Sequence, residues 1–263
     1  MCAYKEITAE VPKELREHTA GRLFRAESIG LSGDAVWISE DTVLKAENNI
    51  PRGVETVNIM RWLSGRLPVP EVIAHTVSGG KSWLLMSRVK GRMSCDEYYL
   101  ERPGKLAELL AQGLMMLWET DISDCPRVRD LDTELAEARQ RVESGLVTQL
   151  SEDCTFGSPA ALLDWLEQNR PACEPVLSHG DFCLPNVFAE GWRISGFIDL
   201  GDCGIADRYR DLSLCLRSYL QNLDGTFGGR VYPGADPDRI LASLGITPDR
   251  DKLQYYLLLD ELF

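Results

Sequence analysis

The sequence predicts an α+β protein in which a small strand-rich N-terminal lobe precedes a larger, mainly helical C-terminal lobe. Short apolar runs separated by turn residues fill residues 1–90, whereas apolar residues recur at three- and four-residue steps through much of the remaining chain. The chain has 263 residues, enough for one large domain or for two lobes that share a cleft. We place the boundary between the two lobes at residue 90, which gives an N-terminal lobe over 1–90 and a C-terminal lobe over 91–263.

The elements of the N-terminal lobe follow one another in a simple order. Residues 23–29 predict a strand, and residues 35–38 and 42–46 predict a hairpin closed by a Ser-Glu-Asp turn. Helical spacing over residues 53–63 ends at a Ser-Gly pair followed by two prolines. A second hairpin is expected with strands at 72–75 and 82–86 around Ser-Gly-Gly. The segment Lys90-Gly91-Arg92 then looks like the crossover into the second lobe.

Helical periodicity dominates the C-terminal lobe. It predicts helices over residues 106–118, 131–146, 162–166 and 253–263. A β-rich insert separates the last of these from the others, with short runs at 176–178, 186–188 and 194–198.

Composition narrows the class of partner. The net charge is −13, from 41 acidic and 28 basic residues, and such a surface repels nucleic acid and anionic membranes but favours a cationic partner. No apolar run approaches the ~20 residues that cross a bilayer, and no secretory signal is apparent, so we expect a cytoplasmic protein. The eight cysteines form no Cys-x-x-Cys pair and are expected to be free thiols, and with only three histidines a His-rich metal site is not expected.

The strongest chemical signal lies in residues 179–186, His-Gly-Asp-Phe-Cys-Leu-Pro-Asn, and residues 198–201, Ile-Asp-Leu-Gly. Phosphoryl transfer needs one carboxylate to orient the attacking hydroxyl and oxygen ligands that hold Mg²⁺ against the phosphates. Asp181 and Asn186 on one tight loop can point separately at the nucleophile and the metal. Asp199, at an expected strand end, can complete the metal site. A lone His-Gly-Asp is often only a surface turn, so the combination carries the prediction.

The N-terminal lobe offers residues that suit a nucleotide. Lys45 lies within an apolar run, where an unpaired ammonium is costly to bury and a phosphate partner removes the cost, although a strand-edge lysine facing solvent is the alternative. The turn Gly30-Leu31-Ser32-Gly33 can present backbone N–H groups and the Ser32 hydroxyl to phosphate oxygens. The chain contains no Gly-x-x-x-x-Gly-Lys-Ser/Thr, which argues against the P-loop class.

These motifs together closely resemble the aminoglycoside 3′-phosphotransferases, whose fold is protein-kinase-like and bilobal. The resemblance runs from about residue 22 to residue 263 and includes Leu-Pro-Val-Pro at 67–70. The narrower markers are Asp-Ile-Ser-Asp-Cys-Pro at 121–126 and Leu-Leu-Leu-Asp-Glu-Leu-Phe at 257–263. The His-Gly-Asp-x-x-x-x-Asn motif is broader, because choline, homoserine and other small-molecule kinases share it.

The resemblance implies a role for each matched residue at the nucleotide. Asp181 would orient or deprotonate the acceptor hydroxyl, Asn186 and Asp199 would bind Mg²⁺, and Lys45 would contact the α- and β-phosphates of ATP, or of GTP. Ser32 would lie over the phosphates, and the backbone of Met86, Ser87 and Arg88 would hydrogen-bond the base.

The resemblance also implies an acidic site for a cationic aminoglycoside. Asp260, Glu261 and a terminal carboxylate on Phe263 would bind substrate ammonium groups, and charged hydrogen bonds of this kind contribute ~1.5–3 kcal/mol each. Without the resemblance, the acidic pair would be interpreted as a solvated helix end. Glu152 and Asp153 lie in a loop that helps to line the substrate cleft in the family.

The sequence departs from the family pattern at three positions. The helix glutamate that pairs with the strand lysine is expected at Thr56, but the acid here is Glu55, and one residue corresponds to about 100° of helix rotation. Either a compensating deletion restores the pair or the pairing is altered. Val43 stands where many relatives have an aromatic ring over the adenine, and Asp202 stands where relatives often have a basic residue.

Three interpretations therefore compete. The first is an aminoglycoside O-phosphotransferase that acts on a 3′-type hydroxyl and gives antibiotic resistance. The second is a kinase of another small hydroxyl metabolite, which the acidic C-terminal segment disfavours. The third is a nucleotide-binding pseudokinase, which the presence of Lys45, Asp181, Asn186 and Asp199 disfavours.

Overall fold

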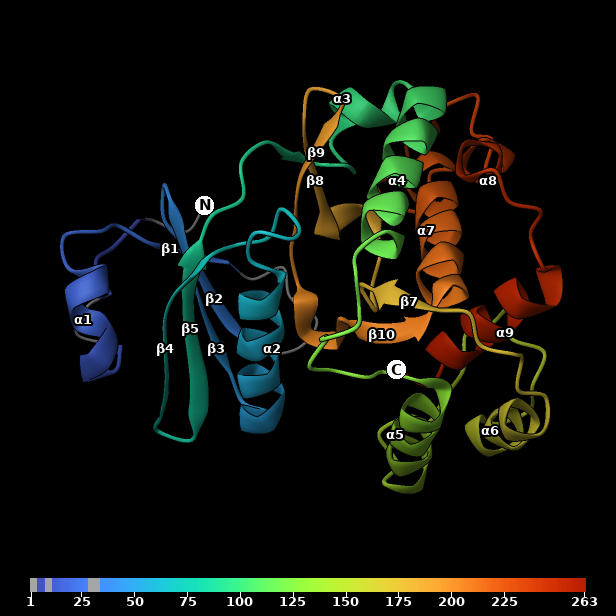
Figure 1. Ribbon diagram of the computed structural model, residues 1–263, viewed down its shortest axis with the longest axis horizontal. Helices are drawn as coiled ribbons and strands as arrows, with labels where there is room; N and C mark the ends of the chain where they lie inside the picture. The colour runs from blue at the N-terminus through green and yellow to red at the C-terminus, as the bar shows by residue number, and fades with distance from the viewer. Residues whose placement is uncertain (1–3, 8–10, 28–33) are drawn as a thin grey trace.

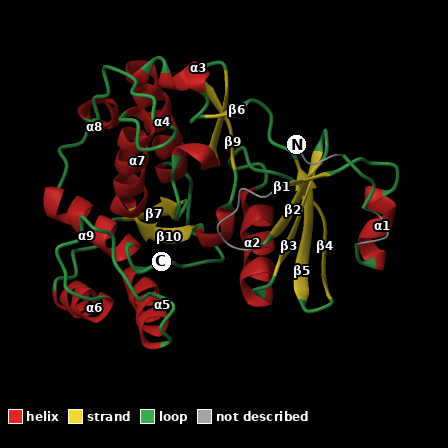
Figure 2. Cartoon of the chain, turned by 180° about the vertical axis from the view of Figure 1, so that it is seen from behind, coloured by secondary structure: helices red, strands yellow, loops and turns green. Residues whose placement is uncertain are grey.

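A computed structural model describes residues 4–7, 11–27 and 34–263 and confirms the α+β class (Figure 1). An antiparallel sheet of five strands lies at one end of the molecule, and most helices lie at the other, as both ribbon views show (Figures 1 and 2). The sheet has the order β1-β2-β3-β5-β4. Its strands are β1 (Arg25–Glu27), β2 (Ala35–Ile38), β3 (Thr42–Glu47), β4 (Val72–Ser78) and β5 (Lys81–Ser87).

Both predicted hairpins are confirmed, because β2 pairs with β3 and β4 pairs with β5. The strand predicted at 23–29 is shorter than expected, since β1 covers only Arg25–Glu27 and Phe24 makes an isolated bridge to Lys5. Residues 28 and 29 lie outside the described residues. Helix α2 (Ile50–Leu63) begins three residues before the predicted start, because the Asn49 side chain accepts the N–H of Arg52 and caps it.

The two faces of this sheet are covered differently. Leu44 and Leu85 point to a small core shared with α1 (Lys13–Thr19). On the other face Leu84 packs with α2 side chains such as Val57 and Leu63. Because side chains alternate along a strand, Lys45 shares the second face with Leu84, its cross-strand partner. The face that carries Lys45 is thus turned toward α2 and the second lobe.

The C-terminal lobe is built around one large apolar core. Its helices are α3 (Glu97–Leu100), α4 (Pro103–Trp118), α5 (Leu131–Glu143), α6 (Pro159–Gln168), α7 (Arg208–Leu223), α8 (Asp238–Leu244) and α9 (Arg250–Asp260). Helix α4 packs against α7 and α8, and α7 packs against α9. Helix α7 was not predicted from the sequence. The last helix ends at Asp260 and not at Phe263, so Asp260 is its final residue and Glu261 lies beyond it.

The β-rich insert is two separate sheets and not one unit. Strand β7 (Pro175–Ser178) pairs with β10 (Gly204–Asp207), which the sequence analysis did not predict. Strand β8 (Val187–Glu190) lies between β9 (Arg193–Phe197) and β6 (Arg92–Met93). Of two short 3₁₀ turns, η1 (Leu184–Asn186) ends the motif at 179–186 and η2 (Leu200–Asp202) begins within the motif at 198–201. The paired strands β8 and β9 reverse the chain between the two motifs and bring the motif at 179–186 beside that at 198–201.

Two further expectations can be compared with the described residues. Every cysteine among them is a free thiol, as predicted. No helix in the described ranges has the length and apolar character needed to cross a membrane.

Candidate active site

The loop between β7 and β8 holds Asp181 and Asn186 side by side. Asn186 Nδ2 donates to Asp181 Oδ2 over 2.8 Å and to the Asp181 carbonyl oxygen over 3.0 Å. This fixes the amide and leaves Asn186 Oδ1 as an acceptor for a cation. Cys183 Sγ donates to Asp181 Oδ1 over 2.6 Å. Burial, and then the neighbouring Asp181, raise the pKa of the Cys183 thiol, so the thiol stays protonated and remains a donor.

Buried polar groups brace this loop from behind. Asp211 of α7 accepts the backbone N–H of His179 over 2.6 Å and that of Gly180 over 2.9 Å. The His179 ring accepts the Asp181 N–H at Nδ1 over 3.3 Å, and its Nε2 lies 2.9 Å from the Ile198 carbonyl oxygen. These two contacts require the neutral ring protonated at Nε2. The ring thus ties the catalytic loop to the end of β9. The sequence analysis missed Asp211, because a single acid in a helix carries no signal.

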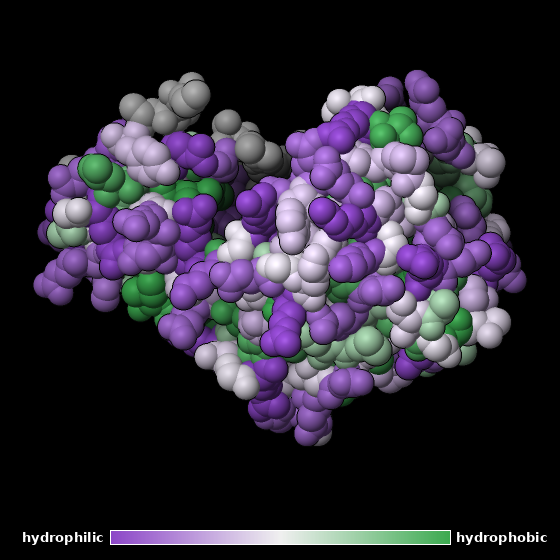
Figure 3. Space-filling view, turned by 90° about the horizontal axis from the view of Figure 1, so that it is seen from above, coloured by the Kyte–Doolittle hydropathy of each residue, from purple (hydrophilic) through white to green (hydrophobic). Residues whose placement is uncertain are grey.

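Asp199 and Lys45 meet across the two lobes. Among the described non-glycine residues only Asp199 has a positive φ, at 57°, a conformation that needs support from its surroundings and is common at functional sites. Lys45 Nζ lies 3.6 Å from Asp199 Oδ1 and 3.5 Å from Asp34 Oδ2. The molecular surface is hollowed between the lobes (Figure 3). The strand lysine and the second motif are therefore neighbours, as the sequence predicts.

The donor set fits a magnesium ion. Asn186 Oδ1 and the Asp199 carboxylate are oxygen ligands, and Mg²⁺ commonly binds one or two carboxylates, several waters and substrate phosphates. The described residues contain no group of three or more His, Cys, Asp and Glu arranged to hold a metal. Asp181 accepts one hydrogen bond on each carboxylate oxygen, from Asn186 and from Cys183, and each oxygen keeps a second lone pair for another donor such as a hydroxyl.

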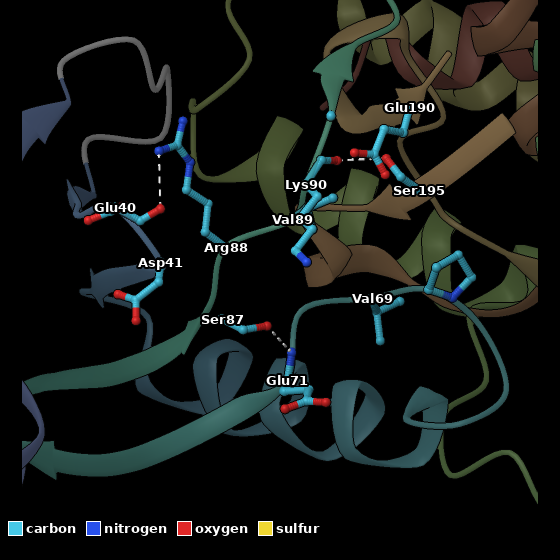
Figure 4. Close-up of a pocket in the computed structure, with 12 residues that line it drawn as sticks. Glu40, Asp41, Val69, Glu71, Ser87, Arg88, Val89, Lys90, Glu190 and Ser195 are labelled. Atoms are coloured by element: carbon cyan, nitrogen blue, oxygen red, sulfur yellow. Dashed lines mark hydrogen bonds between the residues drawn. The ribbon is translucent and has the colours of Figure 1, made fainter. Parts of the chain in front are cut away.

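The segment that links the lobes lines a cavity of about 900 Å³ (Figure 4). Its wall includes Ser87, Arg88, Val89 and Lys90, together with residues of the β2–β3 turn and of the β8–β9 hairpin. Lys45, Asp181, Asn186 and Asp199 are not among its lining residues, so this cavity follows the linking segment and not the metal-binding end of the cleft.

The hydrogen bonds of the linking segment restrict which backbone groups can bind a base. The N–H of Ser87 donates to the Glu71 carbonyl oxygen, and the N–H of Arg88 donates to the Asp41 carbonyl oxygen. The Ser87 hydroxyl accepts the Glu71 N–H over 2.8 Å. The N–H groups of Ser87 and Arg88 are thus used inside the protein, and the contact of Met86, Ser87 and Arg88 with the base stays a prediction.

Glu55 does not form the predicted pair with Lys45. Its carboxylate lies 3.2 Å from Arg127 Nη2 of the second lobe and is largely exposed. Thr56 donates its hydroxyl to the Arg52 carbonyl oxygen over 2.8 Å. Of the two explanations for the offset, the altered pairing is the one observed, because the rotation of about 100° per residue turns Glu55 away from the sheet.

The other departures also have a structural consequence. Asp202 accepts from Arg52 over 2.7 Å, so an acid in η2 is matched by a base on α2. Val43 lies two residues before Lys45 on β3, so both side chains point to the same face of the sheet, toward the cleft. Ser32 and its glycine loop lie outside the described residues.

The acidic residues predicted to bind the substrate have different surroundings in the structure. The Asp260 carboxylate accepts from Arg210 over 3.0 Å and also from Arg217. Burial opposes ionisation of Asp260, but these two arginines outweigh it and lower the pKa of Asp260. Asp260 is thus committed to a buried ion-pair network that also contains Glu134, which lies 2.8 Å from Arg210 Nε.

Glu261 lies beside the other predicted acidic segment. Its two carboxylate oxygens accept the backbone N–H and the hydroxyl of Ser151, both over 2.8 Å. Glu152 and Asp153, both exposed, come directly after Ser151. Arg141 donates to the carbonyl oxygen of Leu262 over 2.8 Å and also to Phe263.

Comparison with known proteins places this arrangement in a family. Residues 28–245 match the phosphotransferase enzyme family. The aminoglycoside 3′-phosphotransferase of Enterococcus faecalis is 39% identical over 211 residues, covering 78% of this chain and 77% of the relative. That of Niallia circulans is 34% identical over 271 residues, covering 98% of this chain and 99% of the relative. The chain belongs to the aminoglycoside 3′-phosphotransferase family. Membership confirms the resemblance and makes the protein a phosphotransferase.

Solved structures of the family agree with the fold. The aminoglycoside-3′-phosphotransferase of type VIII superposes with a TM-score of 0.81 at 26% identity, covering 98% of this chain and all (100%) of that one. The aminoglycoside phosphotransferase APH(3″)-Id of Streptomyces rimosus, in complex with ADP and streptomycin, gives a TM-score of 0.76 at 26% identity, covering 98% of each chain. The kinase-like bilobal fold predicted from the sequence is therefore confirmed.

Proposed function

We propose that the protein transfers the γ-phosphoryl group of ATP to a 3′-type hydroxyl of an aminoglycoside antibiotic and thereby confers resistance. The observation that carries this proposal is the convergence of Lys45, Asp181, Asn186 and Asp199 from three distant parts of the sequence. Such a set contains a carboxylate that can still accept a hydrogen bond from a hydroxyl, oxygen ligands for Mg²⁺ and a cation for phosphates.

Each side chain then has a distinct task. Asp181, held by Asn186 and Cys183, accepts a hydrogen bond from the acceptor hydroxyl and orients its oxygen toward the γ-phosphorus. Such a role contributes ~10²–10⁴-fold in rate. Lys45 contacts the α- and β-phosphates, and Asn186 Oδ1 and Asp199 hold Mg²⁺. When bound, Mg²⁺ neutralises charge on the phosphate oxygens.

The nucleotide belongs to the first lobe, which we assign to residues 1–90. Because the N–H groups of Ser87 and Arg88 are used internally, we assign base recognition to the next residue, Val89, together with backbone carbonyls of the linking segment. The ADP bound in the Streptomyces rimosus relative supports an adenine nucleotide, and Ser32 would cover its phosphates. ATP is available in the cytoplasm, where we place the protein.

The acceptor belongs to the second lobe, residues 91–263. Glu261 is bonded to Ser151, which directly precedes the exposed Glu152 and Asp153, and these three acids suit the ammonium groups of an aminoglycoside. Asp260 and Phe263 serve this site by holding the tail in place, because Asp260 is already neutralised by two arginines. The net charge of −13 would attract a polycation by long-range steering. The streptomycin bound in the Streptomyces rimosus relative supports a substrate of this class.

A coupled ADP-release assay with Mg-ATP tests the proposal. Kanamycin is compared with a kanamycin derivative that lacks the 3′-hydroxyl and otherwise carries the same charges. We expect turnover on kanamycin alone and its loss by ~10²-fold or more in Asp181→Asn, since that variant keeps the shape but not the carboxylate. NMR of the product locates the phosphate.

The remaining acceptors distinguish the alternatives. Equal turnover with both kanamycins would place the phosphate on another hydroxyl. Turnover only on choline or homoserine would establish a metabolite kinase, and nucleotide binding without turnover on any acceptor would establish a pseudokinase. GTP in place of ATP, run in the same assay, determines the nucleotide preference.

A further inference from the structure

Helix α2 contributes no carboxylate to Lys45. The family pattern places the lysine partner at Thr56, whose hydroxyl is bonded to the Arg52 carbonyl oxygen. Glu55 is paired with Arg127 of the second lobe. A lysine that must contact phosphates has a long, flexible side chain, so its ammonium needs another anchor.

Asp34 occupies the position that such an anchor requires. In the β2–β3 register Ala35 faces Ala46 and Val36 faces Lys45, so Asp34 lies diagonally across from Lys45 on the same face of the sheet. Asp34 Oδ2 lies 3.5 Å from Lys45 Nζ. The Asp34 side chain is only 6% exposed, and its Oδ1 accepts the Asn48 N–H over 3.4 Å. The carboxylate is therefore buried and is also bonded to the residue that follows β3.

The other nearby acids are less suited to this task. Asp199 is 3.6 Å from Lys45 Nζ, but its side chain is 52% exposed and it is the residue we assign to Mg²⁺. Glu47 shares the cleft face, yet its ion pair is with Arg52, 3.9 Å away. Once a metal engages Asp199, Asp34 is the carboxylate that remains with Lys45.

We propose that Asp34 is the residue that positions Lys45, replacing the helix glutamate of the family. The anchor and the lysine then lie on adjacent strands of one sheet. In protein kinases the equivalent pair joins a strand to a helix, so movement of that helix can break it. Here Lys45 stays oriented whatever the position of α2, and α2 is tied to the second lobe through Arg52–Asp202 and Glu55–Arg127. This inference rests on the proposed role of Lys45 at the nucleotide phosphates.

A double-mutant cycle tests whether Asp34 acts through Lys45. Four proteins are compared: wild type, Asp34→Asn, Lys45→Met and the double variant. Asn keeps the shape of Asp34, so we expect Asp34→Asn to lower kcat/KM for ATP by about tenfold, the effect of losing one charge-assisted contact. In the Lys45→Met background the same change should cost less than about threefold, because the partner is gone. Equal losses in both backgrounds would overturn the proposal.

A second readout separates this test from the test of the function. The Kd of Mg-ADP, measured by calorimetry without any acceptor, should change about threefold or more on Asp34→Asn and by less than about twofold in the Lys45→Met background. If aminoglycosides are not phosphorylated, this cycle still reports on Asp34. Thermal unfolding without nucleotide identifies misfolded variants, and Asp34→Ala replaces Asp34→Asn in the cycle if the latter does not fold. A Kd change of the same size in both backgrounds would assign Asp34 a purely structural role.

Discussion

Replacement of Asp211 should loosen the catalytic loop from within the core. This aspartate has no exposed surface (0%), and its two oxygens accept the N–H groups of His179 and Gly180 over 2.6 and 2.9 Å. Burial raises the pKa of Asp211, and the bonds from these two residues partly offset the effect. An Asp211→Ala variant would leave both donors without this acceptor.

The expected magnitude can be worked out from the two bonds. An unsatisfied buried donor costs about 1–3 kcal/mol. Gly180 N–H keeps a second acceptor, the Ser178 hydroxyl at 3.1 Å, so its loss should lie near the lower end. The sum is about 2–4 kcal/mol for Asp211→Ala. Asp211→Asn retains one acceptor oxygen and should lose about half as much.

Urea unfolding followed by tryptophan fluorescence measures this loss. Asp164→Ala on α6 is the matched control, because Asp164 is an exposed helix residue. We expect its midpoint to equal that of the wild type and the order of stability to be wild type, Asp211→Asn, Asp211→Ala. If Asp211→Ala unfolds at the wild-type midpoint, the buried carboxylate does not hold the loop and the reasoning is wrong.

Three other changes test separate parts of the site. Gly180→Ala should lower the urea midpoint and abolish turnover, because the backbone φ is +84° and an added Cβ would lie 2.4 Å from the Asp202 carbonyl oxygen. An unchanged urea midpoint would contradict this prediction. Glu55→Gln should change stability by about 1 kcal/mol or less and leave KM for ATP unchanged, since Glu55 is exposed and its partner is Arg127 and not Lys45. A raised KM for ATP would instead indicate that Glu55 acts on Lys45. The pKa of Asp260 is lowered below 3.8, so its arginine pairs stabilise the fold above that pH and are lost as the pH falls through the pKa of the folded state. The free energy of unfolding of Asp260→Asn should therefore lie below that of the wild type by a constant amount from pH 8 to 5, and the difference should shrink below about pH 4.

Local patterns in the sequence were sufficient for the two N-terminal hairpins and for most of the longer helices. Alternation and turn residues predicted both N-terminal hairpins, because strand pairing across a short turn depends on adjacent residues. Helix α7 was not predicted, since Arg210 and Asp211 lie on its buried side and interrupt the apolar period. Strand β10 was missed because its partner β7 lies far away in the sequence.

The chemistry of the site divides in the same way. The motifs at 179–186 and 198–201 indicated Asp181, Asn186 and Asp199 as the candidate site residues, because loop length and residue type together limit what these side chains can do. Only the tertiary structure decided which acidic and basic side chains form ion pairs. Glu55 pairs with Arg127, and Asp34 takes its place beside Lys45. An ion pair depends on distances of a few ångströms between segments far apart in the chain, and no local pattern specifies those distances.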